Sequence, residues 1–117
     1  MTACLMILND PPYGTERSYN GLRLAGSLAR DESTKVRLFL MGDAVACAKK
    51  DQRPPKGYYN LEVMLGSIAR RGGEIGVCGS CMDARGFGDD ELLAGSRRSS
   101  MEELTSWTVA ADRVLVF

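Results

Sequence analysis

Residues 3–10, ACLMILND, are the stretch of sequence that decides the fold. The first six of these residues are all apolar, without the alternation that marks a strand with one face in water. A short continuous apolar run of this kind predicts a strand that is buried on both faces, as in a parallel sheet covered by helices. Pro11, Pro12 and Gly14 follow and end the strand, because proline cannot extend the hydrogen-bond ladder and glycine frees the backbone.

The rest of the chain alternates between helical and extended patterns. The predicted strands are residues 35–42, 74–78, 112–117 and, as a short edge strand, 96–100. The predicted helices are residues 15–30, 44–48, 60–72 and 100–111, with one more helical turn at 89–93. Asn60 is a predicted N-cap, and Ser100 with Glu103 forms a predicted capping box. Strands that alternate with helices predict an α/β domain with a mostly parallel sheet, and residues 1–117 form a single domain without a linker or repeat.

Composition and charge exclude several classes of partner. The chain has 117 residues, 15 Lys and Arg against 15 Asp and Glu, and 44% hydrophobic residues, as in an ordinary globular domain. A net charge of zero gives no electrostatic case for a nucleic acid or an anionic membrane as partner. The first ten residues contain no basic segment and no apolar run long enough for a signal peptide, so we expect a cytoplasmic protein.

Four cysteines and no histidine define the chemistry that is available. Without histidine, neither a Ser-His-Asp nor a Cys-His catalytic arrangement exists, and a histidine-containing zinc site is excluded. In the cytoplasm the four cysteines are expected to be reduced. Cys4 begins the first strand and is interpreted as core, and Cys47 lies on a short amphipathic helix. Cys78 and Cys81 form a C-x-x-C pair where the strand 74–78 ends.

The carboxyl ends of the predicted strands mark the candidate site. In open α/β sheets, functional groups lie in the loops that leave these ends. Three such loops are expected to meet, after the strands 3–10, 35–42 and 74–78. The candidate residues, besides Cys78 and Cys81, are Asn9, Asp10, Tyr13, Arg17, Gly42, Asp43, Gly79, Ser80 and Arg85.

The cysteine pair allows three chemistries. A metal site is weakly supported, because no second cysteine pair stands at zinc spacing, and we expect neither a metal nor another cofactor. A dithiol redox site needs the first cysteine at a helix N-terminus, whereas Gly79, Gly86 and Gly88 favour a flexible loop here. A single nucleophilic thiol on Cys78 fits better, with Arg17 and Arg85 expected to favour the thiolate. Cys81 would then take the sulfur of a Cys78 persulfide or release it by forming a disulfide.

Three segments of the sequence carry a resemblance to a known family. ILNDPPYGTERSYNGLRLAGSLAR, VRLFLMGDAV and GGEIGVCGSCMDARG, together with the C-terminal ELLAGSRRSSMEELTSWTVAADRVLVF, resemble the DsrE/DsrF-like, TusD-related family of sulfur-relay proteins. The resemblance covers essentially the whole chain. It implies a three-layer, flavodoxin-like sandwich that assembles into homotrimers or homohexamers.

The resemblance also implies a function. The family cysteine that accepts persulfide sulfur from a donor protein and passes it to an acceptor protein matches Cys78, so the chain is expected to be a small sulfur carrier. Whether it is an enzyme stays open, and the activity implied is that of a sulfurtransferase acting through a cysteine persulfide. Cys81 departs from the family pattern. Two alternatives therefore remain, a dithiol redox switch of Cys78 and Cys81 and a non-catalytic oligomeric binding module.

Overall fold

Five parallel strands form one sheet in the computed structural model, which describes residues 1–117. The strands are β1 (Thr2–Leu8), β2 (Thr34–Leu40), β3 (Glu74–Cys78), β4 (Ser96–Ser99) and β5 (Arg113–Val116). Their order across the sheet is β4-β3-β2-β1-β5, and every neighbouring pair is parallel. The predicted parallel α/β sheet is therefore confirmed, with five strands and β4 at one edge.

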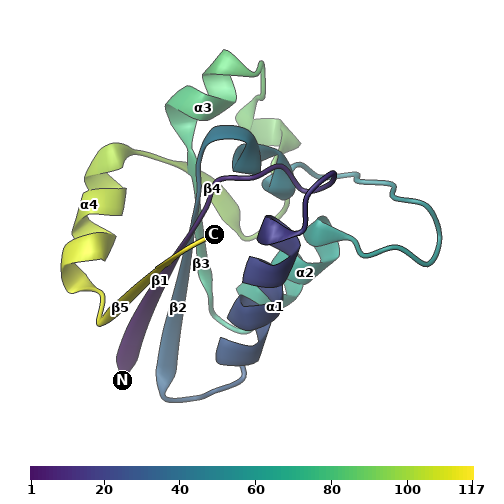
Figure 1. The fold of residues 1–117 in the computed structure, drawn as a ribbon. Coiled ribbons are helices and arrows are strands. Elements are labelled where there is room, and N and C mark those ends of the chain that lie inside the picture. Colours follow the sequence, from purple (N-terminus) through teal and green to yellow (C-terminus); the bar gives the residue numbers. More distant parts are fainter.

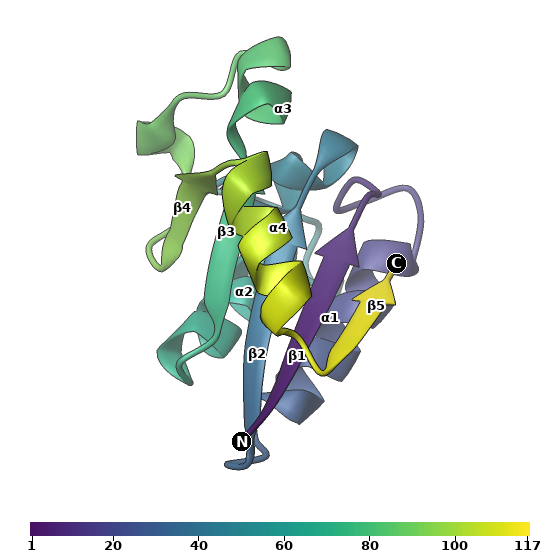
Figure 2. The same cartoon turned by 90° about the vertical axis from the view of Figure 1, so that its left-hand side faces the viewer.

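Helices cover both faces of this sheet and give three layers. Helices α1 (Arg17–Leu28) and α2 (Leu61–Arg70) lie on one face, and α4 (Met101–Ala110) crosses the other (Figure 1, Figure 2). Three short helical segments follow strand ends at the carboxyl edge or lie close to it: the 3₁₀ helix η1 (Gly42–Ala48), helix α3 (Gly79–Ala84) and the 3₁₀ turn η2 (Asp89–Glu91). No helix has the length and apolar character needed to cross a membrane.

The two predicted helix starts differ in detail. The Asn60 side chain accepts a hydrogen bond from the Val63 N–H, which confirms it as the N-cap of α2. The Ser100 hydroxyl likewise accepts from the Glu103 N–H at the start of α4. The Glu103 carboxylate, however, binds Arg97 and the Ser99 hydroxyl instead of turning back to Ser100. Only one half of the predicted capping box forms, because β4 offers the carboxylate a cation.

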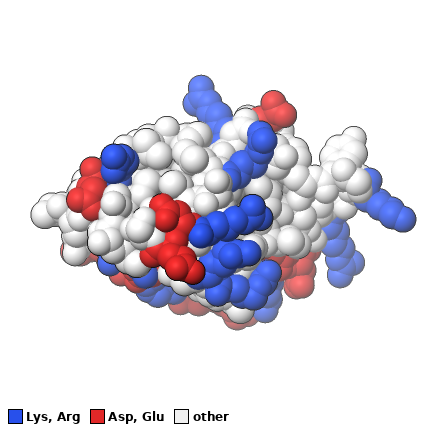
Figure 3. Space-filling view, turned by 90° about the horizontal axis from the view of Figure 1, so that it is seen from below, with Lys and Arg blue, Asp and Glu red and all other residues white.

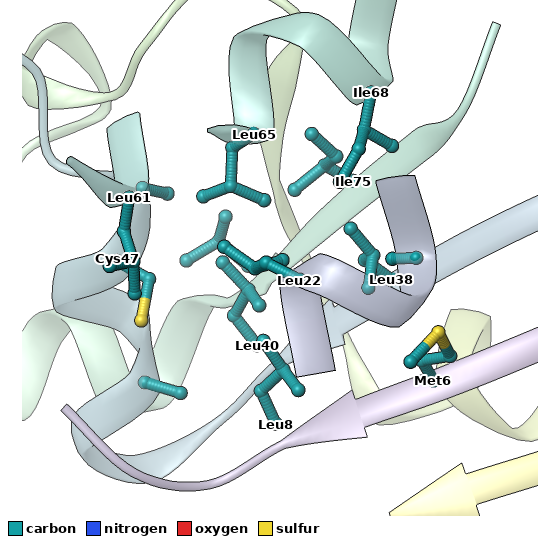
Figure 4. Close-up of a cluster of buried hydrophobic side chains, with 14 of the residues drawn as sticks. Met6, Leu8, Leu22, Leu38, Leu40, Cys47, Leu61, Leu65, Ile68 and Ile75 are labelled. Atoms are coloured by element: carbon teal, nitrogen blue, oxygen red, sulfur yellow. The ribbon is translucent and has the colours of Figure 1, made fainter. Parts of the chain in front are cut away.

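The two faces of the sheet hold cores of unequal size. On the α1 and α2 face, 19 buried residues form one cluster, which includes Cys4, Cys47 and Leu65 (Figure 4). On the α4 face, only Leu5, Phe39, Leu104 and Trp107 are buried together. Because successive side chains of a strand point to opposite faces, β1 supplies Met6 to the large cluster and Leu5 to the small one. The α4 face is therefore the thinner and more open side of the molecule.

Candidate functional site

The three loops that leave the carboxyl ends of β1, β2 and β3 meet as the sequence predicts. The Met41 N–H donates to the Leu8 carbonyl at 3.1 Å, and the Gly42 N–H donates to the Cys81 Sγ at 3.2 Å. The Cys47 thiol reaches the Asp10 carbonyl at 3.7 Å. These hydrogen bonds hold the three loops together at the carboxyl edge of the sheet, where the cysteine pair lies.

Cys78 is the last residue of β3 and the N-cap of α3. The expectation of a flexible loop after Cys78 was wrong, since residues 79–84 form a helix. Gly86, at φ +73°, ends this helix, and the buried Met82 anchors it in the core. A Cβ on Gly79 would lie 2.9 Å from the Arg98 Nη1, so this glycine permits a close approach to β4 rather than flexibility. The glycines bound a short helix that begins at Cys78.

Cys81 lies three residues further along, on the first turn of α3. Residues three apart are neighbours on a helix surface, so both half-buried thiols belong to one small group. The Cys81 Sγ accepts the Gly42 N–H, and Gly42 adopts a φ of +59° to present it. The Cys78 Sγ lies 3.4 Å from the Ser80 Oγ. The two sulfur atoms therefore have different hydrogen-bond partners.

These partners shift the pKa values of the two thiols in opposite directions. Burial raises the pKa of Cys78, but hydrogen bonds from the Cys81 and Ser80 side chains and backbone N–H groups outweigh it. The net result is a Cys78 pKa below its ordinary value of 9.0. Burial and the bond that Cys81 donates to Cys78 raise the pKa of Cys81, although the Gly42 N–H and Arg85 oppose this rise. Cys78 is thus the more acidic thiol of the pair and Cys81 the less acidic one, which is the difference that distinguishes a nucleophilic cysteine from its neighbour.

The arginines take other roles than expected. Arg85 binds Asp43 at 2.8 Å and donates to the Cys81 carbonyl, so it fixes α3 against η1. Arg17 is 75% exposed and lies 4.0 Å from Asp10. Neither is among the main causes of the lowered pKa of Cys78, and the expectation that they favour its thiolate stays a prediction. The main stabilisation comes from the first turn of α3, through the Cys81 thiol, the Ser80 hydroxyl and the backbone N–H groups of both residues.

A cavity of about 210 Å³ opens beside Cys78. It lies between the start of α3 and the junction of β4 with α4, and Ser80, Ser99 and Met101 are among its lining residues. Ser99 pairs with Cys78 across the β3–β4 register, which places it beside the thiol. The sequence analysis missed Ser99 and Met101, because the strand order that brings β4 next to β3 cannot be read from the sequence. Cys78 therefore faces a space that admits a small sulfur group.

The remaining predicted residues sit in the same loops without touching the thiols. Asn9 donates its side-chain amide to the Phe117 carbonyl and ties β1 to the C-terminus. The Asp10 carboxylate accepts the Thr15 hydroxyl. Tyr13 donates to the Gln52 side chain and accepts the Leu61 N–H, on the α2 side of the edge. No hydrogen bond or ion pair joins these three side chains to Cys78 or Cys81, and their place in the site stays a prediction.

The other two cysteines lie inside the protein. Cys4 is buried near the amino end of β1, which agrees with its interpretation as core. Cys47 is fully buried on η1, and Figure 4 shows it beside Leu61. Burial raises the pKa of Cys47 to about 12. No group of three or more Cys, Asp or Glu side chains is arranged to hold a metal ion.

Comparisons with known proteins agree with this architecture. A model of the DsrE/DsrF-like family matches residues 3–117. The chain is 38% identical to Protein YchN of Escherichia coli K12, over the full length of both chains. It is 34% identical to an uncharacterized protein of Methanopyrus kandleri, covering 96% of this chain and 91% of that one.

Solved structures give the same result for the fold. The crystal structure of the ychN protein from E. coli superposes with a TM-score of 0.94 over all of both chains, at 38% identity. A protein of unknown function from Methanobacterium thermoautotrophicum superposes with a TM-score of 0.77 at 14% identity, over 98% of this chain and 99% of that one, and shares the fold. The match of the family model over nearly the whole chain, with full-length relatives above 30% identity, shows that this protein belongs to the DsrE/DsrF-like family.

Proposed function

We propose that this protein is a sulfur carrier in which Cys78 holds the transferred sulfur as a persulfide. Membership of the DsrE/DsrF-like family fits a sulfur-relay role. The single observation that supports Cys78 as the carrier is its lowered pKa at the start of α3, beside an open cavity. A thiolate is the reactive form of cysteine, so Cys78 is the one cysteine of the four whose surroundings favour nucleophilic attack at neutral pH.

The proposed transfer is balanced in atoms and electrons. The Cys78 thiolate attacks the terminal sulfur of a donor persulfide, R–S–SH. The donor S–S bond breaks as the new S–S bond forms, and the donor leaves as the thiolate R–S⁻. Cys78 then carries –S–SH, and the thiolate of an acceptor protein removes the terminal sulfur in the same way. The Ser80 hydroxyl and the backbone N–H groups of α3 stabilise the Cys78 thiolate that attacks the donor and that leaves again when the acceptor removes the sulfur.

The test is intact-mass spectrometry after incubation with a cysteine desulfurase and free cysteine. The native chain and Cys81→Ser are expected to gain one sulfur atom, and Cys78→Ser to gain none. Cys47→Ala is the matched control, because Cys47 is buried and is expected to leave the gain unchanged. No added sulfur on the native chain, with its fold intact by circular dichroism, would refute the proposal.

A second candidate is a dithiol switch, and the position of Cys81 one turn along α3 favours it. In this chemistry the Cys81 thiolate attacks the inner sulfur of the Cys78 persulfide. A Cys78–Cys81 disulfide forms, the persulfide bond breaks, and the terminal sulfur leaves as HS⁻. Two thiols are thereby oxidised and the carried sulfur is reduced to sulfide. This switch predicts two observations for the native chain that are absent in Cys81→Ser. Sulfide is released, and the mass of the protein falls by that of two hydrogen atoms relative to the reduced protein.

Assembly into a homotrimer or homohexamer, with separate donor and acceptor proteins in the cytoplasm, is part of the same proposal. The open α4 face of the sheet supports self-association. Val114 and Val116 of the edge strand β5 are 41% and 65% exposed, and Val116 pairs in register with Ile7. Met101, at the start of α4, is a further exposed apolar residue and lines the cavity beside Cys78. Sedimentation equilibrium checks it: Val116→Glu is expected to reduce the mass of the assembly, and a native monomer would contradict the proposal.

A further inference from the structure

A groove of about 320 Å³ runs between α1 and α2, separate from the cysteine edge. Ten residues line it, and three of them are arginines: Arg23 on α1, Arg30 just beyond α1 and Arg71 just beyond α2. None of the ten is acidic. The whole chain has 15 basic and 15 acidic residues, so its net charge is zero. The groove differs from the rest of the chain because its charged residues are all basic.

The three arginines have no carboxylate partner within the protein. Ion pairs form elsewhere, as at Arg85 and Arg98, but none involves Arg23, Arg30 or Arg71. Arg23 donates only to the Asn20 side chain and lies over the ring of Tyr19. At the end of the molecule where α1 and α2 finish, Lys and Arg side chains gather with Asp and Glu side chains beside them (Figure 3). Within the groove itself, however, the three arginines have no ion-pair partner.

Arg30 and Arg71 have a partial structural explanation. Each follows the end of its helix, where the free carbonyl groups favour a nearby cation. Arg23 has no such explanation, because it lies in the middle of α1. Stabilisation of a helix end does not require an arginine at position 23, because Arg23 lies far from either end of α1. An anionic occupant of the groove accounts for all three.

The floor of the groove is shaped for close approach. A Cβ built on Gly26 meets no atom within 4 Å, so the space above this residue is open. Ser27 and Ser67 are also small, and Val63, which is exposed, forms an apolar wall. A floor of small residues between two helices allows the backbone of a third helix to come near. The apolar wall supplies contact area for the apolar side of that helix.

We propose that this groove docks an acidic amphipathic helix of a partner protein. Arg23 lies on α1 and Arg30 in the turn that follows it, seven residues further on. Seven residues of helix rise about 10 Å, which matches carboxylates spaced two turns apart on a helix laid along the groove. The third arginine, Arg71 just beyond α2, binds a carboxylate on the other side of the same helix. Helix-in-groove recognition commonly combines such an apolar seam with flanking charges.

The proposal stands independently of the sulfur chemistry. None of the groove residues lines the cavity beside Cys78, so an occupant of the groove leaves the thiol accessible. A partner held here would be recruited by its charge while the carboxyl edge stays free for transfer. Cys78→Ser is expected to leave docking unchanged, and removal of the arginines is expected to leave sulfur loading from a small persulfide unchanged.

The experiment uses a synthetic helical peptide of about 18 residues, with Leu and Ala on one face and Glu flanking that face at two-turn spacing. A twin peptide carries Lys in place of Glu. Titration of the ¹⁵N-labelled full chain at low salt is followed by NMR. The acidic peptide is expected to shift the amide signals of Gly26, Ser27 and Ser67, and the Lys twin to shift none of them.

Variants separate charge from shape. The triple variant Arg23→Gln, Arg30→Gln, Arg71→Gln is expected to weaken binding at least about tenfold, since each exposed ion pair is worth a factor of about two to five. Gly26→Leu keeps every charge and fills the floor, and it is expected to weaken binding as much. The matched control is Arg53→Gln with Lys56→Gln, two cations of the exposed loop before α2, which is expected to bind as the native chain does.

Three results would overturn the proposal. Equal binding of the Lys twin would exclude recognition by charge. Unchanged binding by the triple variant would place the peptide elsewhere. If Gly26→Leu lowers the sedimentation mass of the protein in the absence of peptide, the groove is an interface between copies of this chain and its occupant is not an acidic partner helix.

Discussion

Cys78 and Cys47 lie in loops that meet at the same edge of the sheet, yet their environments give them opposite chemistry. Cys47 is sealed in the 19-residue cluster, where burial raises its pKa to about 12. Cys78 packs against both clusters but remains half-buried, and hydrogen bonds from α3 lower its pKa. The difference shows that reactivity here comes from the local partners of a thiol and not from its place at the carboxyl edge alone.

The largest expected effect is a difference in alkylation rate between these two thiols. At pH 7.5, iodoacetamide is expected to modify Cys78 at least about a thousandfold faster than Cys47. The pKa of Cys47 is about 12 and that of Cys78 lies below 9.0, so the thiolate fraction of Cys47 is at least about a thousandfold smaller. Burial of Cys47 widens the gap. Peptide mass spectrometry over time measures both rates in one sample. Similar alkylation rates for the two cysteines in the folded protein would contradict the difference in their environments. In urea, where the fold is lost, the two cysteines are expected to react at equal rates, which is the control.

The raised pKa of Cys47 also predicts a pH dependence of stability. The folded thiol stays protonated up to about pH 12, whereas the unfolded thiol ionises near pH 9. Stability is therefore complete below pH 9 and falls as pH rises through this window, by about 1.4 kcal/mol per pH unit. Urea unfolding between pH 8 and 10.5 is expected to show a steeper decline for the native chain than for Cys47→Ala. Parallel declines would mean that Cys47 is not sealed from water.

A smaller effect separates stability from reactivity. Asn60→Ala removes the N-cap of α2 and a hydrogen bond from the Asn60 amide to the Gln52 carbonyl. The free energy of unfolding is expected to fall by about 1 kcal/mol, the usual contribution of an N-cap. The alkylation rate of Cys78 is expected to stay unchanged, because no side-chain hydrogen bond or ion pair joins α2 to the cysteine group. A slower Cys78 in this variant would show that the two regions are energetically linked.

The fold was predictable from the sequence because its signals are local. The continuous apolar run 3–8 predicts a strand buried on both faces, and the spacing of Leu61, Met64, Leu65 and Ile68 predicts one face of α2. All of these residues are buried except Ala3, Ile7 and Met64, which are partly buried. The convergence of three loops at the carboxyl edge also follows from parallel strands alone. The order of the strands does not, since nothing local in β4 says that it pairs with β3.

The site was predictable in part for the same reason. Cys78 and Cys81 stand out by residue type, and their position after β3 follows from the strand pattern. The helix after Cys78 was missed because Gly79 and Gly86 were interpreted as signs of flexibility, whereas each serves a fixed geometry at an end of α3. Arginine stabilisation of the thiolate was expected because Arg85 follows Cys78 in the same loop and Arg17 follows a loop that converges on it. Asp43 and Asp10 take these arginines instead, and only the folded positions of the carboxylates show it.

The smallest expected effect tests the cause of the difference between Cys78 and Cys47 directly. Ser80→Ala removes the hydroxyl that lies 3.4 Å from the Cys78 Sγ. Because a hydrogen bond to the thiolate favours the charged form, its loss is expected to move the Cys78 pKa upward and to slow alkylation at neutral pH a few-fold, with the rates converging at high pH.

The pH profile of the alkylation rate carries the test, since a change in access would lower the rate equally at every pH. Ser106→Ala, an exposed serine on α4, is the matched control and is expected to reproduce the native profile. If Ser80→Ala also leaves the inflection pH of the alkylation profile unchanged, the backbone N–H groups of α3 and the Cys81 thiol alone lower the Cys78 pKa. The contrast with Cys47 would then rest on the Cys81 thiol and on where α3 begins, and Cys81→Ala would separate the side-chain contribution from that of the backbone.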